Sequence, residues 1–298
     1  MGTPVFAVKS LERLYNDGHE IKYVFTREDK PRNRGMKLSF SPVKELAVSH
    51  GTAVYQPASL KDSRVTELIR DSGCDLIVVV AYGKILPKEL LSIPSFGCIN
   101  IHASLLPKYR GASPIQHALL NGEKETGVTS ILLSEHIDTG DILSVKKTSI
   151  GENETSGDLF DRLSDLGADL LSETIDLISS GSIKRIPQII DETSYAPMLT
   201  KEMSKIDWND TAYNIKCKVR AFNPRPAATT EVNGVYLKVF TVDITSNRTD
   251  HSPGSVVSYG KSGIEVACSD GTVLIKEVQA PGSKRMAAAD YIRGRQAN

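Results

Sequence analysis

The amino-acid sequence predicts a two-part α/β protein, in which a helix-covered parallel sheet is followed by a small all-β domain. Between residues 6 and 181, apolar stripes with helical spacing alternate with short apolar runs, which is the order of βαβ units. The run DLIVVVA (75–81) is continuously apolar and β-branched, as is typical of strands covered on both faces. After residue 205, alternating runs such as GVYLKVF (234–240) are separated by Gly, Asn and Asp, which indicates a β-barrel or sandwich.

The elements of the first part follow from local signals. Ser41 and Pro42 form an N-cap and first-turn pair at the start of one helix. Thr155 and Asp158 form a capping box ahead of a long helix that Gly181 ends. The predicted helices cover residues 6–17, 42–50, 63–72 and 155–180. The predicted strands cover residues 21–25, 53–56, 75–81, 97–102, 128–133 and 141–150.

Composition narrows the classes of function. The 298 residues are 40% hydrophobic and 24% charged, with a formal net charge of zero. Residues 205–298 hold 13 Lys and Arg against 9 Asp and Glu, which gives +4 and leaves −4 for residues 1–204. No apolar window approaches the about 20 residues of a membrane span, and MGTPVFAVKS lacks the regions of a secretory signal. We therefore expect a cytoplasmic protein without a membrane partner.

The cysteines and histidines do not indicate a metal centre. The four cysteines are scattered without a CxxC pair, so we expect reduced structural thiols. The six histidines are dispersed, without HExxH, and the sequence contains neither GxxxxGK[ST] nor GxGxxG. We expect no metal and no phosphate loop.

An amide and an imidazole end one of the predicted strands. Asn100 and His102 are two residues apart in GCINIH, so their side chains share one face. The carboxyl end of a central parallel strand is where open α/β sheets place ligand crevices. Amide and imidazole donors together suit a site where negative charge develops on a carbonyl oxygen. The alternative is a structural pair of satisfied polar side chains.

A carboxylate that orients the imidazole would complete such a site. Asp138, in the turn HIDTGDI between two predicted strands, is able to reach the same crevice. Asp141 fits equally well on spacing alone. Asp138 would also serve as a plain turn residue, with Gly140 as its left-handed partner.

These segments together resemble a known family. NIHASLLPKYRGASPIQHALLNGEKETGVTSILL (100–133), followed by IDTGDIL (137–143), resembles the formyltransferase family that uses 10-formyltetrahydrofolate. The motif Asn-x-His-x-Ser-Leu-Leu-Pro with Asp-x-Gly at this separation selects Asp138 over Asp141. The β-rich tail and further stretches resemble the members that formylate methionyl-tRNA almost end to end; these stretches are MGTPVFAV, DKPRNRGMKLSFSPVKELA, DLIVVVAYGKILP and YAPMLTKEMSKIDW.

The resemblance implies a Rossmann-like catalytic domain (1–181), a linker (182–205) and an OB-like tRNA-binding domain (206–298). It implies that Asn100 and a protonated His102 stabilise the oxyanion while Asp138 holds His102. The residues implied to contact folate are Lys84, Ile85, Leu86, Ser104, Leu105, Leu106 and Pro107, with the 134–138 turn near the pterin. The residues implied to contact tRNA are Arg27, Lys30, Arg32, Arg34 and Lys37.

The same resemblance implies the substrates and leaves alternative functions to be weighed. The implied substrates are 10-formyltetrahydrofolate and initiator methionyl-tRNA, and we expect a monomer. Composition favours a solvated loop for residues 27–44, whereas the resemblance favours a loop that enters the acceptor stem. The rivals are a sugar-nucleotide formyltransferase, a folate-hydrolysing relative and a non-catalytic RNA-binding protein. The three polar residues argue against the last of these.

Two departures from the family pattern are visible in the sequence. The family has a short apolar strand just before MGTP, a place that Met1 already occupies, so we expect a shortened chain or a different start. Without that strand, its neighbours would expose unpaired backbone groups. In FNPRPAAT, Arg225 stands where the family tends to have Trp between two prolines.

Overall fold

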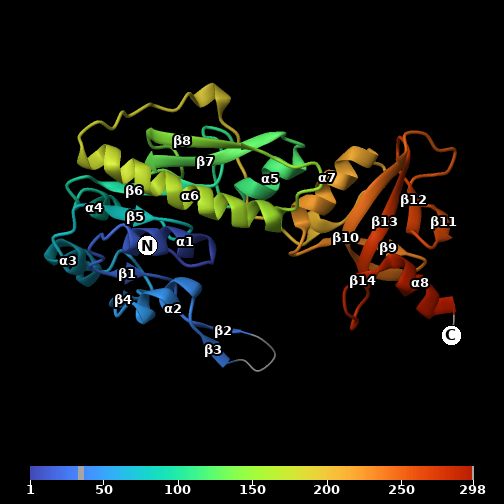
Figure 1. Ribbon diagram of the computed structural model, residues 1–298, viewed down its shortest axis with the longest axis horizontal. Coiled ribbons are helices and arrows are strands. Elements are labelled where there is room, and N and C mark those ends of the chain that lie inside the picture. The colour runs from blue at the N-terminus through green and yellow to red at the C-terminus, as the bar shows by residue number, and fades with distance from the viewer. Residues whose placement is uncertain (33–36, 297–298) are drawn as a thin grey trace. The chain divides into compact units, whose positions relative to one another are not determined.

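The computed structural model describes residues 1–32 and 37–296, which form two compact units (Figure 1). The first unit contains residues 1–114, 125–149 and 160–196, and the second contains residues 115–124, 150–159 and 197–298. The predicted linker thus divides between the units at residue 196, and it contains two short 3₁₀ helices, Ile190–Glu192 and Glu202–Ser204. The three functional boundaries predicted from the sequence stay a prediction.

A four-stranded sheet forms the centre of the first unit. Strand β5 (Ile77–Val79) lies parallel to β6 (Cys98–His102), which continues antiparallel to β7 (Glu125–Leu132) and β8 (Ile142–Ser149). A parallel pair, β1 (Val24–Phe25) and β4 (Val54–Tyr55), forms a separate sheet. The Rossmann-like parallel arrangement is therefore present, with an antiparallel extension at β7 and β8.

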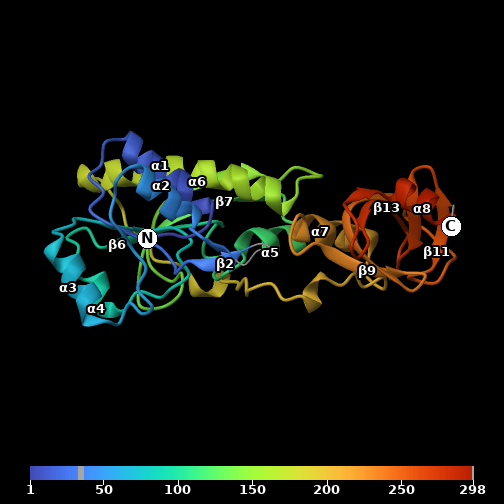
Figure 2. The same cartoon turned by 90° about the horizontal axis from the view of Figure 1, so that it is seen from below.

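Helices cover both faces of this sheet. The helices of the first unit are α1 (Phe6–Asn16), α2 (Pro42–Ser49), α3 (Ser63–Asp71), α4 (Lys88–Leu91) and most of α6 (Ser156–Ser179), whereas α5 (Pro114–Leu120) lies almost wholly in the second unit. Figure 2 shows α1 and α6 on one side of the strands and α3 and α4 on the other. Val79 and Ile99 are 7% and 0% exposed, as expected for strands between two helical layers. Within the described residues, no helix is both long and apolar enough to cross a bilayer.

Both predicted helix caps are confirmed. The Ser41 hydroxyl accepts a hydrogen bond from Lys44 N (3.2 Å), and Pro42 opens α2. At α6, Thr155 N donates to Asp158 Oδ2 (3.0 Å) while Asp158 N donates to Thr155 Oγ1 (3.3 Å). Each bond satisfies an amide that the first helical turn leaves without a partner.

The sheet is interrupted between β1 and β5, as expected from the sequence. Met1 and Gly2 lie in this gap: Gly2 N donates to Phe25 O and Val80 N donates to Met1 O, both at 2.9 Å. The Met1 amine donates to Val78 O (2.6 Å), and burial lowers its pKa to about 5.

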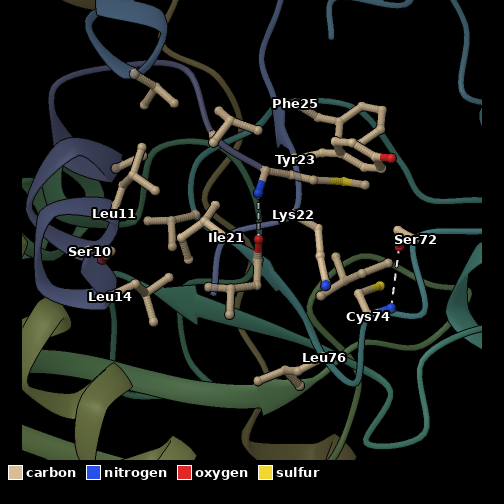
Figure 3. Close-up of a pocket in the computed structure, with 18 of the residues that line it drawn as sticks. Ser10, Leu11, Leu14, Ile21, Lys22, Tyr23, Phe25, Ser72, Cys74 and Leu76 are labelled. Carbon is tan, nitrogen blue, oxygen red and sulfur yellow. Dashed lines mark hydrogen bonds between the residues drawn. The ribbon is translucent and has the colours of Figure 1, made fainter. Parts of the chain in front are cut away.

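A cavity of about 140 Å³ lies beside this gap (Figure 3). Side chains of Leu11, Leu14 and Ile21 line it together with Leu76 and Ile77. The predicted strand 21–25 is correspondingly reduced to the two residues of β1, because Met1 and Gly2 offer it only a short pairing partner on this side.

The second unit contains an antiparallel sheet of six strands in the order β11-β12-β13-β10-β9, with β14 on β13. Its elements are α7 (Ala212–Phe222), β9 (Ala228–Val232), β10 (Val235–Ser246), β11 (Val256–Gly260), β12 (Gly263–Ala267), β13 (Thr272–Gln279), β14 (Met286–Ala287) and α8 (Ala288–Gln296). Asn233 and Gly234, both at positive φ, join β9 to β10, the chemistry that tight hairpins require. The predicted small β domain is confirmed.

Residues 27–44 differ from the predicted loop. Strands β2 (Lys30–Arg32) and β3 (Lys37–Ser39) pair antiparallel, with Pro31 opposite Leu38. Both strands of a two-stranded sheet are edge strands, where proline is tolerated. Pro31 is therefore compatible with strand pairing here.

Candidate active site

Strand β6 carries the predicted amide and imidazole. Ile99 and Ile101 point into the core, at 0% and 2% exposure, so Asn100 and His102 project to the opposite face. His102 is itself only 6% exposed. The alternation of apolar and polar side chains thus delivers both polar groups to the carboxyl end of β6.

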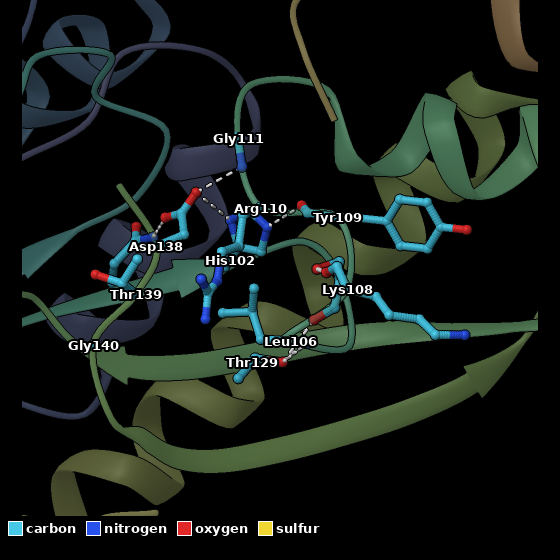
Figure 4. A network of polar contacts seen from close by, with 12 residues as sticks. His102, Leu106, Lys108, Tyr109, Arg110, Gly111, Thr129, Asp138, Thr139 and Gly140 are labelled. Carbon is cyan, nitrogen blue, oxygen red and sulfur yellow. Dashed lines mark hydrogen bonds and ion pairs between the residues drawn. The ribbon is translucent and has the colours of Figure 1, made fainter. Parts of the chain in front are cut away.

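Asp138 reaches both of these side chains from the turn between β7 and β8. Its Oδ2 lies 3.5 Å from His102 Nδ1 and accepts a hydrogen bond from Gly111 N (2.9 Å), as Figure 4 shows. Its Oδ1 accepts from Asn100 Nδ2 at 3.4 Å. The structure thus brings the three predicted residues together, while their catalytic roles stay a prediction.

The conformation of the turn explains why this aspartate, and not the next one, faces the site. Asp138 has φ +51°, a left-handed conformation that Asp tolerates better than most residues. A Cβ on Gly140 would lie 1.6 Å from Leu132 O, so only glycine fits there. Asp141 already runs alongside β7, where its carbonyl accepts from Leu132 N (2.9 Å).

The His102 ring faces oxygen atoms at both nitrogens. Its Nε2 is 2.9 Å from Tyr109 O, and because a carbonyl only accepts, Nε2 carries the hydrogen. Its Nδ1 faces the Asp138 carboxylate. A second proton on the ring would make this contact a charge-assisted hydrogen bond.

The loop after β6 is held by a second segment that the sequence placed in a linker. Tyr109 N donates to Ser194 Oγ (2.9 Å) and Arg110 N donates to Ser194 O (2.9 Å). Ala196 N returns a bond to Arg110 O (2.7 Å). Gly111, at φ +116°, approaches Ala196 so closely that a Cβ would lie 2.8 Å from its carbonyl oxygen. Residues 194–196 therefore form one wall of the candidate site.

The predicted folate residues of the β6 loop lie beside Asn100, His102 and Asp138. Thr129 links two of them, since its Oγ1 donates to Ser104 O (2.6 Å) and accepts from Leu106 N (3.2 Å). Ser104 and Leu106 are buried, whereas Leu105 and Pro107 are half-buried. These bonds fix the backbone of the loop.

The predicted folate residues at 84–86 have three different environments. Lys84 Nζ donates to Ala58 O (2.9 Å) and to Pro57 O, so its ammonium is already bound. Leu86 is 5% exposed and belongs to the core, whereas Ile85 is 67% exposed. An ion pair between Lys88 and Glu135 (2.8 Å) joins this segment to the 134–138 turn. The two segments predicted near the pterin are thus neighbours.

The predicted tRNA residues are only partly described. The Arg27 guanidinium donates to Gly83 O. Lys30, Arg32 and Lys37 belong to the β2–β3 hairpin. Arg34 lies outside the described residues.

Sequence reasoning missed Gln188. Its Nε2 donates to the carbonyl oxygens of Asp138 (2.9 Å) and Gly140 (2.7 Å), and its Oε1 accepts from Arg110. A lone Gln in an irregular polar segment carries no periodicity or motif that would have singled it out.

The cysteines play no part in this arrangement. Burial raises the pKa of the Cys98 thiol, on the same strand as His102, to about 12, so it is a neutral thiol near pH 7. Among the described residues, no group of three or more His, Cys, Asp or Glu is arranged to hold a metal ion.

Comparison with known proteins agrees with this geometry. The "Formyl transferase" family model matches residues 1–175, and the "Formyl transferase, C-terminal domain" model matches residues 198–296. The chain is 46% identical over 296 residues to the methionyl-tRNA formyltransferase of Ruminiclostridium cellulolyticum, covering 99% of this chain and 95% of that one. It is also 46% identical to the methionyl-tRNA formyltransferase of Alkaliphilus oremlandii over 294 residues, covering 99% of this chain and 95% of that one.

A solved structure shares the fold. An N-formyltransferase from Helicobacter canadensis, in complex with folinic acid and dTDP-3-aminofucose, superposes with a TM-score of 0.67 at 20% identity, covering 94% of this chain and 97% of that one. Because both family models match and nearly half of the residues are identical along almost the whole chain, this protein belongs to the formyl transferase family, among the methionyl-tRNA formyltransferases.

Proposed function

We propose that the chain transfers the formyl group of 10-formyltetrahydrofolate to the α-amino group of initiator methionyl-tRNA, which yields N-formylmethionyl-tRNA for translation initiation. The observation that carries the proposal is the convergence of Asn100, His102 and Asp138 at the end of β6, in a chain 46% identical to a methionyl-tRNA formyltransferase.

The reaction needs stabilisation of an oxyanion and the movement of one proton. The amine attacks the formyl carbon, and the resulting tetrahedral carbon releases N10 of tetrahydrofolate, which takes up the proton that the amine loses. Asn100 Nδ2 makes a long hydrogen bond of 3.4 Å to Asp138. Little hydrogen-bond energy is therefore lost when this amide turns toward the oxyanion. The protonated ring of His102 is the second donor, and its Nε2 must share or exchange its bond to Tyr109 O. Asp138 stabilises the imidazolium, and a water beside Asp138 takes the amine proton and passes it to N10.

Folate binding is proposed for the loop after β6 and for the two segments joined by Lys88 and Glu135. Ile85 and Ile137, at 67% and 57% exposure, offer apolar side chains on those segments. A pterin ring stacked there would cover both. Among the predicted residues, Leu86 and Lys84 would act through the backbone they hold, because both side chains are already engaged.

The acceptor distinguishes this proposal from its rivals. The purified chain is to be supplied with 10-formyltetrahydrofolate and, separately, with methionyl-tRNA, a dTDP-linked amino sugar, or buffer alone, while released tetrahydrofolate is measured. We expect kcat/KM for methionyl-tRNA to exceed that for the amino sugar at least about a hundred-fold. Faster release with the sugar, or equal release in buffer, would instead identify a sugar formyltransferase or a folate hydrolase.

We propose that tRNA is bound by the basic residues of the segment 27–37 and by the second unit, to which residues 205–298 contribute a charge of +4. Arginine pairs bidentately with phosphate. Lys44, although in the same region, is bound to Asp29 (2.5 Å) and Gln56 (2.7 Å), so we assign it to support of the hairpin.

Salt dependence tests this surface. Replacing Arg32 and Arg34 with Ala should raise KM for methionyl-tRNA and flatten its dependence on salt, because each phosphate contact contributes about 0.7–0.9 to the log–log slope. The matched control is Arg64→Ala with Arg70→Ala, two exposed arginines on α3 that change the net charge equally. An unchanged slope in the Arg32 and Arg34 variant would remove the hairpin from the proposed tRNA surface.

We also propose that the protein acts as a monomer in the cytoplasm. Charged initiator tRNA is available there, and the four cysteines, which are free thiols, suit a reducing compartment.

A further inference from the structure

Gln188 occupies an unusual place in the segment 182–196. Its neighbours Ile186 and Ile189 are 56% and 58% exposed. The Gln188 side chain, in contrast, is half-buried, and its amide nitrogen donates hydrogen bonds toward the candidate active site. An amide that points inward from an otherwise exposed segment is held there by defined hydrogen-bond partners. Here its partners are two carbonyl groups on either side of Thr139.

These two carbonyls belong to the turn that presents Asp138. Gln188 Nε2 donates to Asp138 O (2.9 Å) and to Gly140 O (2.7 Å), so both hydrogens of one amide close the turn. The turn needs such support, because Asp138 has a left-handed backbone (φ +51°), which is strained for a residue with a side chain. Moving the Asp138 carbonyl would also swing its carboxylate.

Arg110 fixes the orientation of the Gln188 amide. Its Nε and Nη2 both donate to Gln188 Oε1, at 3.0 and 2.7 Å. Because a guanidinium only donates, the amide oxygen must face Arg110, and the NH₂ group must face the turn. Arg110 is 5% exposed and directly precedes Gly111, whose N–H donates to Asp138 Oδ2 (2.9 Å). One side chain therefore links the two backbone stretches that hold the carboxylate.

We propose that Gln188 is a positioning residue for formyl transfer: through Arg110 and the 138–140 turn it sets the Asp138 carboxylate against His102 and Asn100. The expected effect on kcat rests on the proposed function, whereas the expected effect on the position of Asp138 does not. Gln188 touches none of the reacting atoms. It acts on the rate only through the position of Asp138.

Two variants of similar length separate its contacts. Gln188→Met removes every hydrogen bond. Gln188→Glu keeps an acceptor for Arg110, and so holds the segment in place, but it brings carboxylate oxygens to the two carbonyls in place of donors. We expect both variants to lower kcat by about ten- to a hundred-fold, as loss of a supporting shell typically does, with KM for each substrate within about two-fold. The matched control is Gln279→Met, which removes a half-buried amide bond to Ser283 O (2.9 Å) in the second unit and should leave kcat unchanged.

A measurement without substrate separates failure of this inference from failure of the proposed function. The Gly111 amide proton reports its bond to Asp138 by NMR, and we expect its signal to move upfield in both Gln188 variants but not in Gln279→Met. If the parent chain is inactive on methionyl-tRNA and the signal still moves, the proposed function fails and the positioning role stands. If the signal stays and kcat changes less than two-fold, the positioning role is overturned. Should Gln188→Met not fold, Gln188→Glu decides by the same two criteria.

Discussion

Replacing Asp138 with Asn is expected to lower kcat for formyl transfer by about a hundred- to a thousand-fold, the usual cost of losing one electrostatic contribution to an oxyanion site. The carboxylate accepts from Gly111 N, faces His102 Nδ1 and accepts from Asn100 Nδ2. An Asn amide has one acceptor oxygen and no charge, so its NH₂ group must face at least one of these donors. The imidazolium then loses its counter-charge.

Steady-state kinetics with methionyl-tRNA, together with equilibrium binding of a folate, would check this expectation. Folate affinity should change little, because the backbone at Ser104 and Leu106, two of the proposed folate residues, is held by Thr129 and not by Asp138. Asp141→Asn is the matched control three residues away and should keep its rate. A turn residue without a catalytic role would give the opposite pattern, in which Asp138→Asn melts at a lower temperature but turns over at nearly the parent rate.

Adding a short apolar segment before Met1 is expected to raise the melting temperature by on the order of 10 °C. Such a segment would extend the stretch Met1–Gly2 backwards between β1 and β5 and cover the cavity lined by Leu11, Leu14 and Ile21. Burying about three apolar side chains contributes roughly 1.5–3 kcal/mol each, and each kcal/mol shifts Tm by about 2–4 °C in a unit of this size. The comparison is with an extension of equal length made of Ser and Gly. Equal melting temperatures for the two extensions would show that the cavity does not accept a strand.

The same extension should remove a pH dependence. Burial lowers the pKa of the Met1 amine to about 5, whereas in the unfolded chain it lies near 8. Between these values the unfolded state binds more protons, so the free energy of unfolding rises with pH from about 5 to about 8, by up to about 4 kcal/mol. Below pH 5 the Met1 amine is protonated in both the folded and the unfolded state, and the full destabilisation from burying the charged amine is present. In the extended chain an amide replaces the amine, and urea denaturation across this window should show that contribution disappear.

Local chemistry accounts for what was predictable from the sequence. The caps at Ser41 and Thr155 depend on neighbours within three residues, and the alternation in β6 is visible in five. The family motif then distinguished Asp138 from Asp141. Each of these signals lies in one short stretch of chain.

What escaped prediction depends on contacts between distant residues. Strand β1 is shorter than its apolar run because its partner on one side is only Met1 and Gly2. Gln188 matters because the fold sets it against a turn 48 and 50 residues earlier in the chain. No property of the residue itself reveals this.

The packing of Ser194 and Ala196 against the loop after β6 has a consequence for biosynthesis. Tyr109 and Ser194 are separated by 85 positions, so that wall cannot close until residue 196 of 298 has left the ribosome. Strand β6, which ends at His102, has been made well before then. Since nascent domains generally fold as they emerge, this wall is completed only after more than about two-thirds of the chain has been made.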